Sequence, residues 1–154
     1  MGKVKPYILV IKEPFQYLIL GLGIYVFFRS SQVYFNNWLL NQKIGFDLQW
    51  VRTYTLQLGT FLPDWFLFSL PDGLWLLSFC LLMKSLWEQD DKRKLWFWTL
   101  ILPIVSLLWE IGQSIKIISG TFDFTDLLFY AIVTLIIIYK NKKTNYEKLH
   151  KTII

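Results

Sequence analysis

Four runs of apolar residues are the strongest constraint on what this chain can fold into. They cover about residues 15–35, 70–87, 95–115 and 124–140. Each is close to the roughly 20 residues that a helix needs to cross a hydrocarbon core about 30 Å thick. In that core the backbone has to satisfy its own hydrogen bonds, and a helix does so within one segment. The sequence therefore predicts an all-α integral membrane protein, a four-helix bundle that forms a single domain over residues 1–154.

The composition agrees with a membrane protein and argues against other classes. Hydrophobic residues make up 55% of the chain, above the roughly 45 to 50% of a soluble domain. A net charge of +5 suits nucleic acid only where basic residues share one surface; here they stand at the ends of the apolar runs, so no nucleic-acid partner is expected. The single cysteine, Cys80, can form neither an internal disulfide nor a thiolate metal site. We expect it to be buried, and we expect no metal and no cofactor.

The basic residues predict how the spans are oriented. Lysine and arginine concentrate on the cytoplasmic side of membrane proteins, and most of these residues flank the start of the chain, the second and third spans, and the end. The residues on this side are Lys3, Lys5, Lys12, Lys84, Lys92, Arg93, Lys94, Lys140, Lys142, Lys143, Lys148 and Lys151. Both termini are therefore predicted to be cytoplasmic, in a bacterial cytoplasmic (inner) membrane, with residues 141–154 as a basic tail suited to anionic lipid.

The segments between the spans differ in kind. Lys12, Glu13 and Pro14 mark the start of the first span, where proline suits the first helical turn. Residues 87–94 are charged and short, which predicts a tight helical hairpin. The longer segment over residues 30–69 is rich in aromatic residues, so we expect short helices at the outer interface. A re-entrant hairpin is the alternative.

Glu110 is the acidic residue that a membrane span tolerates least. It lies about 22 Å along a span that starts at Leu95, at 1.5 Å rise per residue. Gln113 follows three residues later and therefore shares its face of the helix. Both side chains should face the bundle interior, where an ionised Glu110 needs a cation or a network of hydrogen-bond donors.

Three further acids are expected to meet Glu110 at the outer end of the bundle. Asp123 and Asp126 open the fourth span, and Asp72 opens the second. Arg29, near the outer end of the first span, is the expected counter-charge, because an unpaired arginine in a span is costly, and Lys116 is the reserve. An alternative assigns Asp72 to a capping box with Ser69 and Asp123 to a helix cap; Glu110 and Asp126 are harder to explain by capping.

These motifs resemble the signature of a known family. Glu110-x-x-Gln113, a glycine-containing turn and Phe122-Asp123-x-x-Asp126-Leu127-Leu128 resemble the VanZ-like membrane proteins, small bacterial multi-helix proteins of which one is linked to resistance against teicoplanin. Asp72 is similar to that family's acid before an apolar helix. The resemblance covers about half the chain, residues 69–139, and implies a role in the cell envelope.

The chain departs from the family pattern at several positions. Thr121 stands where the family usually has an arginine, and Phe129 and Tyr130 stand where an asparagine usually follows. Gly73, Leu74 and Trp75 replace the basic and histidine residues that commonly follow the first acid. Arg29 is expected to supply from the first span the positive charge that the turn lacks.

Three functions fit these residues. The first is a binding or processing site for an envelope lipid or lipid-linked glycan, because carboxylates accept hydrogen bonds from hydroxyl groups and attract ammonium groups. Its residues are Arg29, Asp72, Glu110, Gln113, Asp123 and Asp126, and their oxygen atoms would also suit a divalent ion. The second is a non-catalytic accessory subunit of a larger membrane complex. The third is an intramembrane hydrolase or transferase with Glu110 as general base.

Overall fold

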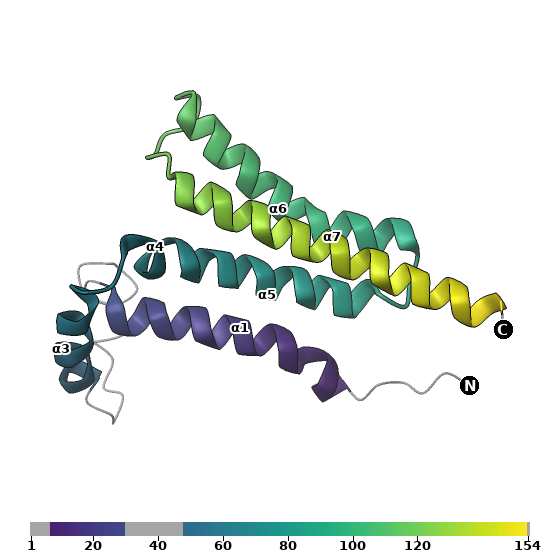
Figure 1. The fold of residues 1–154 in the computed structure, drawn as a ribbon, viewed down its shortest axis with the longest axis horizontal. Helices are drawn as coiled ribbons and strands as arrows, with labels where there is room; N and C mark the ends of the chain where they lie inside the picture. The colour runs from purple at the N-terminus through teal and green to yellow at the C-terminus, as the bar shows by residue number, and fades with distance from the viewer. Residues whose placement is uncertain (1–6, 30–47, 154) are drawn as a thin grey trace.

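The computed structural model describes residues 7–29 and 48–153, and its regular elements in those ranges are all helices (Figure 1). They are α1 (Tyr7–Phe28), α3 (Leu48–Gly59), α4 (Asp64–Leu67), α5 (Ser69–Trp87), α6 (Lys92–Ser114) and α7 (Phe124–Ile153). The predicted all-α fold is confirmed. Residues 30–35 of the expected first span and 30–47 of the expected outer segment lie outside the described ranges.

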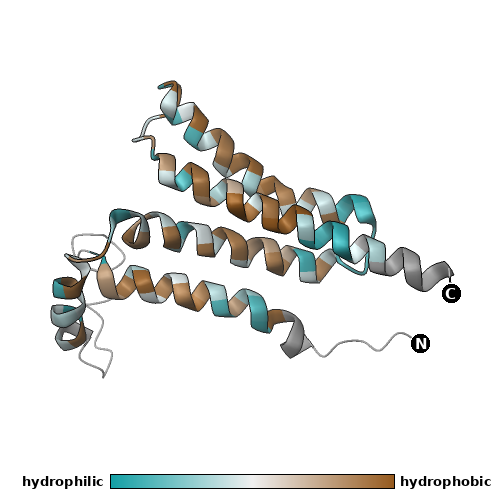
Figure 2. Ribbon diagram, viewed as in Figure 1, coloured by the Kyte–Doolittle hydropathy of each residue, from teal (hydrophilic) through white to brown (hydrophobic). Residues whose placement is uncertain are grey.

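Four of the helices have the length and composition of membrane spans. The spans are Ile11–Phe28, Asp64–Trp87, Lys92–Ser114 and Phe124–Thr144. Figure 2 shows hydrophobic residues along each long helix, with hydrophilic residues gathered at the end of the bundle that carries the turn between α5 and α6. The chain is thus a multi-pass membrane protein, and the predicted second and third spans lie within a few residues of α5 and α6.

The predicted start of the first helix is wrong. α1 begins at Tyr7, so Pro14 lies inside the helix and not in its first turn. The helix ends at Phe28, with Arg29 in a bend, and the rest of the expected span lies outside the described residues. Lys12 and Glu13 suggested a boundary because they are charged, but Glu13 pairs with Lys140 of α7. A charged residue that has a partner can lie inside a membrane helix, whereas a charged residue without one would be expected at the end of the helix.

The predicted tail is also wrong in its start. α7 continues without interruption beyond residue 140 to Ile153. Asn141 is 0% exposed and Thr144 is 9% exposed, so this first turn of the expected tail packs into the bundle. Polar residues ended the apolar run in the sequence, but these two have polar partners on α6 and just after α5.

The long helices pack side by side in the order α1, α5, α7 and α6 where α6 ends and α7 begins (Figure 1). α5 contacts α1, α6 and α7, and α6 contacts α7. The core lies between α5 and α7, where Cys80 is 0% exposed, as expected. Its buried residues are Leu76, Cys80, Leu81, Val133 and Ile137.

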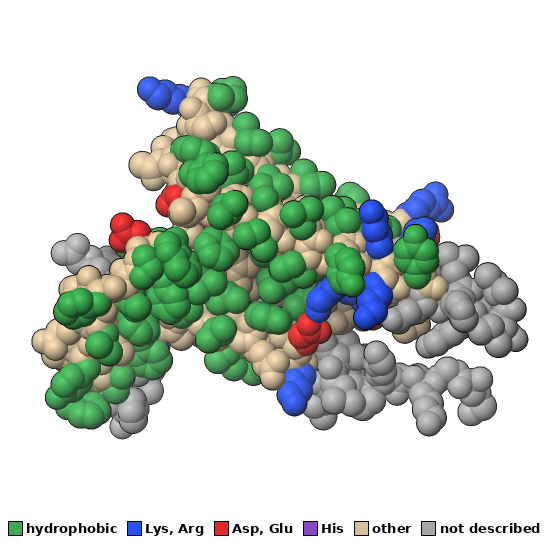
Figure 3. All heavy atoms as spheres, viewed as in Figure 1, with side chains coloured by type: hydrophobic (Ala, Val, Ile, Leu, Met, Phe, Trp, Pro, Cys, Tyr) green, Lys and Arg blue, Asp and Glu red, His purple; other side chains and the backbone are tan. Residues whose placement is uncertain are grey.

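Large apolar side chains cover the outside of the bundle. Phe97, Leu108 and Leu135 are among those that are more than half exposed, and Figure 3 shows hydrophobic side chains over most of the visible face. Lipid tails are as apolar as these side chains, so helix association in a membrane depends on close packing and polar contacts. The exterior of the molecule therefore matches a hydrocarbon environment.

The two ends of the bundle carry different connections. α1 begins and α7 ends at one end, together with the tight turn at residues 88–91 (Figure 1). In that turn Asp91 caps α6, because its carboxylate accepts a hydrogen bond from the Arg93 amide at 3.0 Å. The predicted hairpin is confirmed. The opposite end carries α3, α4 and the turn between α6 and α7.

α3 is a short helix of the kind expected between the first and second spans, whereas α4 lies within the second candidate span, Asp64–Trp87. α3 lies across the end of α1 (Figure 1). One side of it is exposed and aromatic, with Trp50 and Tyr54 in edge-to-face contact. Its other side carries Arg52, which is 3% exposed. Such an amphipathic helix suits the end of a bundle of spans.

Close approach of α1 to α5 depends on Gly21. A Cβ added there would lie 2.7 Å from Nε1 of Trp75 and 3.2 Å from the Pro71 carbonyl oxygen, whereas one added at Gly23 would meet nothing within 4 Å. We predict that Gly21→Ala lowers the free energy of unfolding by about 1–3 kcal/mol through overpacking.

Gly23→Ala is the matched control, and it should be neutral or stabilise the protein by up to about 1 kcal/mol through helix propensity. Reversible unfolding in mixed detergent micelles measures both. Equal effects of the two variants would contradict the packing described for Gly21.

Candidate functional site

Three helices bring acidic side chains to the end of the bundle opposite the chain termini. Asp72 lies in the first turn of α5, Glu110 in the last turns of α6 and Asp126 in the first turn of α7. We call these three residues the acidic cluster. Their charges act on one another: those of Asp126 and Glu110 act on Asp72, and that of Asp126 acts on Glu110. Residues that are far apart in the sequence thus share one electrostatic environment.

Glu110 faces the protein interior. The residue is only 6% exposed, and its Oε2 atom accepts a hydrogen bond from the Asp123 backbone amide at 3.3 Å. The neighbouring Trp109 and Ile111 are about half exposed on the lipid side of α6. The helix therefore turns its acid inward and its apolar residues outward, as expected for a costly charge at membrane depth.

Asp123 acts as a helix cap, which confirms that alternative. Its Oδ1 accepts hydrogen bonds from the Thr125 amide at 2.8 Å and from the Thr125 hydroxyl at 2.6 Å. These two bonds stabilise the ionised form and lower the pKa of the Asp123 carboxyl below its ordinary value. Because Oδ1 is already engaged, Asp123 contributes to the acidic cluster mainly through its charge on Glu110 and Asp126.

Asp72 does not take part in the capping box that the sequence suggested. The N-cap of α5 is Phe68, and no side chain provides a cap hydrogen bond. Ser69 lies inside the helix, and its hydroxyl is 2.6 Å from the Thr125 hydroxyl of α7. The expected cap residue was thus used for a contact between helices, and Asp72 is left to interact through its charge.

Asp126 lies one turn into α7, beyond the cap. Its Oδ1 is buried without a hydrogen-bond partner among the described residues, while Ser69 of α5 interacts with the carboxylate. A carboxylate oxygen in that position is costly unless a donor reaches it. Because Asp123 already caps the start of α7, Asp126 has no role as a helix cap.

Gln113 holds the turn that follows α6. With its amide oxygen toward the indole of Trp109, it accepts from Nε1 at 3.1 Å and donates to the Thr121 carbonyl at 3.1 Å. Gly120, at a φ of 142°, brings the backbone against this amide. Gln113 thus shapes the α6–α7 turn, and its amide is not directed at an acid of the cluster.

Arg29 is the cation of the site. Its guanidinium lies 5.1 Å from the ring centroid of Tyr25 and 5.0 Å from that of Phe68. Its positive charge acts on both Asp72 and Asp126 and partly offsets their negative charges. The reserve cation, Lys116, is exposed at a φ of 60° after the end of α6.

Tyr130 belongs to the site and was missed by the sequence reasoning. The charges of Asp72, Asp126 and Glu110 all act on its phenol. The signal was available, because Tyr130 follows Asp126 by four residues and so lies on the same face of α7. In the sequence, Tyr130 stood out only because the VanZ-like pattern usually has an asparagine near this position.

The divalent-ion alternative finds no support in the geometry. Within residues 7–29 and 48–153, no group of three or more histidine, cysteine, aspartate or glutamate side chains is arranged to hold a metal ion.

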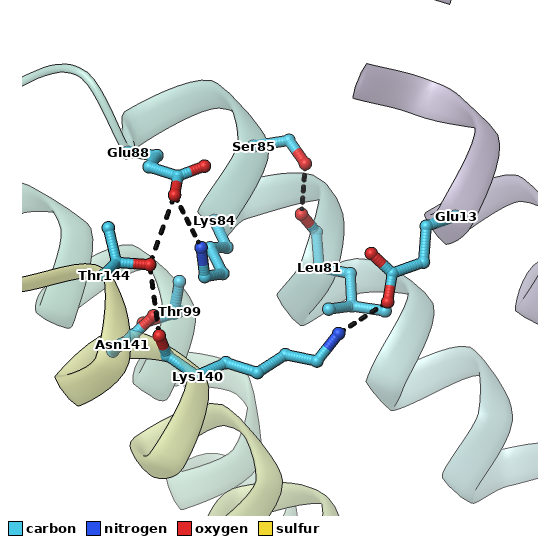
Figure 4. Close-up of polar contacts among 9 residues, drawn as sticks. All are labelled: Glu13, Leu81, Lys84, Ser85, Glu88, Thr99, Lys140, Asn141 and Thr144. Carbon is cyan, nitrogen blue, oxygen red and sulfur yellow. Dashed lines mark hydrogen bonds and ion pairs between the residues drawn. The ribbon is translucent and has the colours of Figure 1, made fainter. Parts of the chain in front are cut away.

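A second polar network, also missed, holds the other end of the bundle (Figure 4). The buried Asn141 of α7 donates from Nδ2 to Oγ1 of Thr99 on α6 at 2.8 Å. One turn further, Thr144 donates to Glu88 at 3.2 Å, and Lys84 pairs with the same carboxylate at 2.9 Å. We call these five residues the polar clamp. Together with the Lys140–Glu13 ion pair, it joins α1, α5, α6 and α7.

We predict that Asp123→Ala lowers the free energy of unfolding by about 1 kcal/mol at neutral pH through loss of the cap. Because the folded pKa lies below the ordinary value of 3.8, the cap contribution is complete above that value and is lost as the pH falls through the folded pKa. The difference between wild type and variant, measured by unfolding from pH 7 to pH 2, should shrink toward the acid end. Asp123→Asn retains an acceptor and is the control. A difference that grows on acidification would contradict the assignment.

The polar clamp makes a separate prediction. Thr99→Val and Asn141→Leu should each cost about 1 kcal/mol of stability, since interhelical hydrogen bonds in membranes contribute about that much. The double variant should cost less than the two together, because it leaves neither partner buried alone. Thr134→Val, which removes only a bond within α7, is the control. Strict additivity would mean that the Asn141–Thr99 bond contributes nothing.

Comparison of the chain with models of protein families, with curated proteins and with solved structures finds no match.

Proposed function

We propose that the acidic cluster, with Arg29 and Tyr130, is an outward-facing site that binds or helps to process the headgroup of an envelope lipid or a lipid-linked glycan. In this proposal the protein lies in a bacterial cytoplasmic membrane, with both termini in the cytoplasm and the acidic cluster on the outer side. The proposal includes a relationship to the VanZ-like proteins.

The convergence of Asp72, Glu110 and Asp126 from three helices is the observation that carries the proposal. Three carboxylates and one guanidinium leave the site with an excess of acid, and Glu110 is 6% exposed. Intramembrane acids of this kind are costly for the fold and usually mark a site. A purely structural ion pair would need no more acids than cations.

The chemistry of these groups suits polyhydroxylated or cationic headgroups. Carboxylates accept hydrogen bonds from hydroxyl groups and attract ammonium groups, and Arg29 provides a cation that a phosphate can share. The cluster lies at one end of the spans, where headgroups lie when acyl chains surround the apolar exterior.

The relationship to the VanZ-like proteins is supported by the place of the motif residues. Glu110 lies on α6, and Asp126 lies on α7. The two helices meet here, because Glu110 accepts a hydrogen bond from the amide of Asp123, just before α7. Gln113 holds the turn that joins the two motifs. The charge of Arg29 acts on Asp126, which is the part expected of the arginine that the turn lacks.

Lipid-resolving mass spectrometry of the purified protein tests the proposal. Wild type should retain a prenyl-linked or glycolipid species, and Glu110→Gln with Asp126→Asn should lose most of it while the protein still purifies as one homogeneous species. Asp90→Asn, at the opposite end in the α5–α6 turn, is the matched control and should retain the lipid.

Two outcomes would count against this site. Retention of the same lipid by the double amide variant would remove the acids from binding. Failure of that variant to assemble, with a stoichiometric protein partner bound to wild type, would favour the accessory-subunit function.

A further inference from the structure

The end of α1 is held by side chains from α3. The last carbonyl groups of a helix have no partner within it and carry the negative end of the helix dipole. Arg52 of α3 donates from Nη1 to the Val26 carbonyl and from Nη2 to the Arg29 carbonyl at 2.7 Å. The Thr55 hydroxyl donates to the Phe27 carbonyl at 2.5 Å. α3 therefore caps α1 from another part of the chain.

Arg52 is built into this position. The residue is only 3% exposed, and a guanidinium presents several donors in a fixed plane, so that one side chain reaches two carbonyl groups. A lysine carries the same charge but has no such fork.

The second bond of Arg52 falls on the residue that neutralises the acidic cluster. The backbone of Arg29 accepts from Arg52, while its guanidinium lies over Tyr25 and Phe68 and attracts Asp72 and Asp126. Arg29 lies in a bend at the end of α1, where its amide still donates to the Tyr25 carbonyl at 3.3 Å. Its carbonyl lies beyond the last turn of the helix, and the Arg52 bond holds that side of the peptide backbone.

We propose that Arg52 is a positioning residue of the acidic site, and that it holds the Arg29 backbone so that the Arg29 guanidinium stays over Tyr25 and Phe68, where its charge acts on Asp72 and Asp126. This inference rests on the proposed function in one respect, namely that Arg29 is part of the proposed site. Thr55 provides the contrast, because it caps the same helix through Phe27 and does not bond to Arg29.

Nuclear magnetic resonance of arginine side chains in micelles tests this role. The sequence contains three arginines, Arg29, Arg52 and Arg93, and Arg93, with a side chain that is 93% exposed, is an internal reference. In Arg52→Lys the Arg29 Nε signal should shift, and its hydrogen exchange with water should accelerate about fivefold, because loss of the bond to the Arg29 carbonyl, worth about 1 kcal/mol, lets the residue move. Thr55→Val should leave the Arg29 signal in place.

A reciprocal measurement keeps Arg52 intact. Coupling between two sites acts in both directions, so Asp72→Asn should shift the Arg52 signal as well as that of Arg29, and should leave Arg93 unchanged. This variant does not alter the cap of α1, so it remains informative if Arg52→Lys does not fold.

The proposal is overturned if Arg52→Lys and Thr55→Val change the Arg29 signal equally, because Arg52 would then act only as a cap. It is also overturned if Arg52 does not respond to Asp72→Asn. Neither measurement uses a lipid. A negative result here therefore does not contradict the proposed lipid binding, and a failure of lipid binding does not prevent these signals from being measured.

Discussion

The cost of leaving a charge or a backbone polar group without a partner in apolar surroundings governs this structure. Four apolar helices gain little by meeting one another in lipid. What joins them is close packing at Gly21 and a set of polar contacts whose loss would leave buried groups unsatisfied. At one end Arg52 takes the free carbonyl groups of α1, and at the other Asn141 bonds to Thr99. These contacts set the positions of α1 and α7, and with them those of Arg29 and Asp126.

The two ends of the bundle use charge differently. Around the polar clamp, each of these acids has a basic partner: Glu13 pairs with Lys140, and Glu88 pairs with Lys84. At the other end the acids exceed the cation that attracts them, and one carboxylate oxygen of Asp126 is buried without a partner among the described residues. A fold that needed only stability would gain from apolar residues at these positions. The imbalance is therefore the strongest physical reason to place a function at the acidic cluster.

Part of the fold and of the site could be predicted from local pattern. The apolar runs gave the second and third spans, because length and composition alone decide whether a helix can cross a membrane. The first span was misjudged because Lys12 and Glu13 look like a boundary when the partner on α7 is unknown. The tail was misjudged for the same reason at Asn141. Ser69 matched a capping pattern, yet its hydroxyl contacts Thr125, since the same side chain satisfies either arrangement locally.

The sequence by itself determined that this chain is helical, that it crosses a membrane four times and that its acids are few and costly, because these properties depend on the residue types along each segment. Only the tertiary structure decided which acids meet, that Asp123 caps while Asp72 does not, that Gln113 holds a turn, that Tyr130 lies with the acids, and that Arg52 bonds to Arg29. Those facts depend on the distances between side chains of different helices, and such distances follow from how the helices pack against one another.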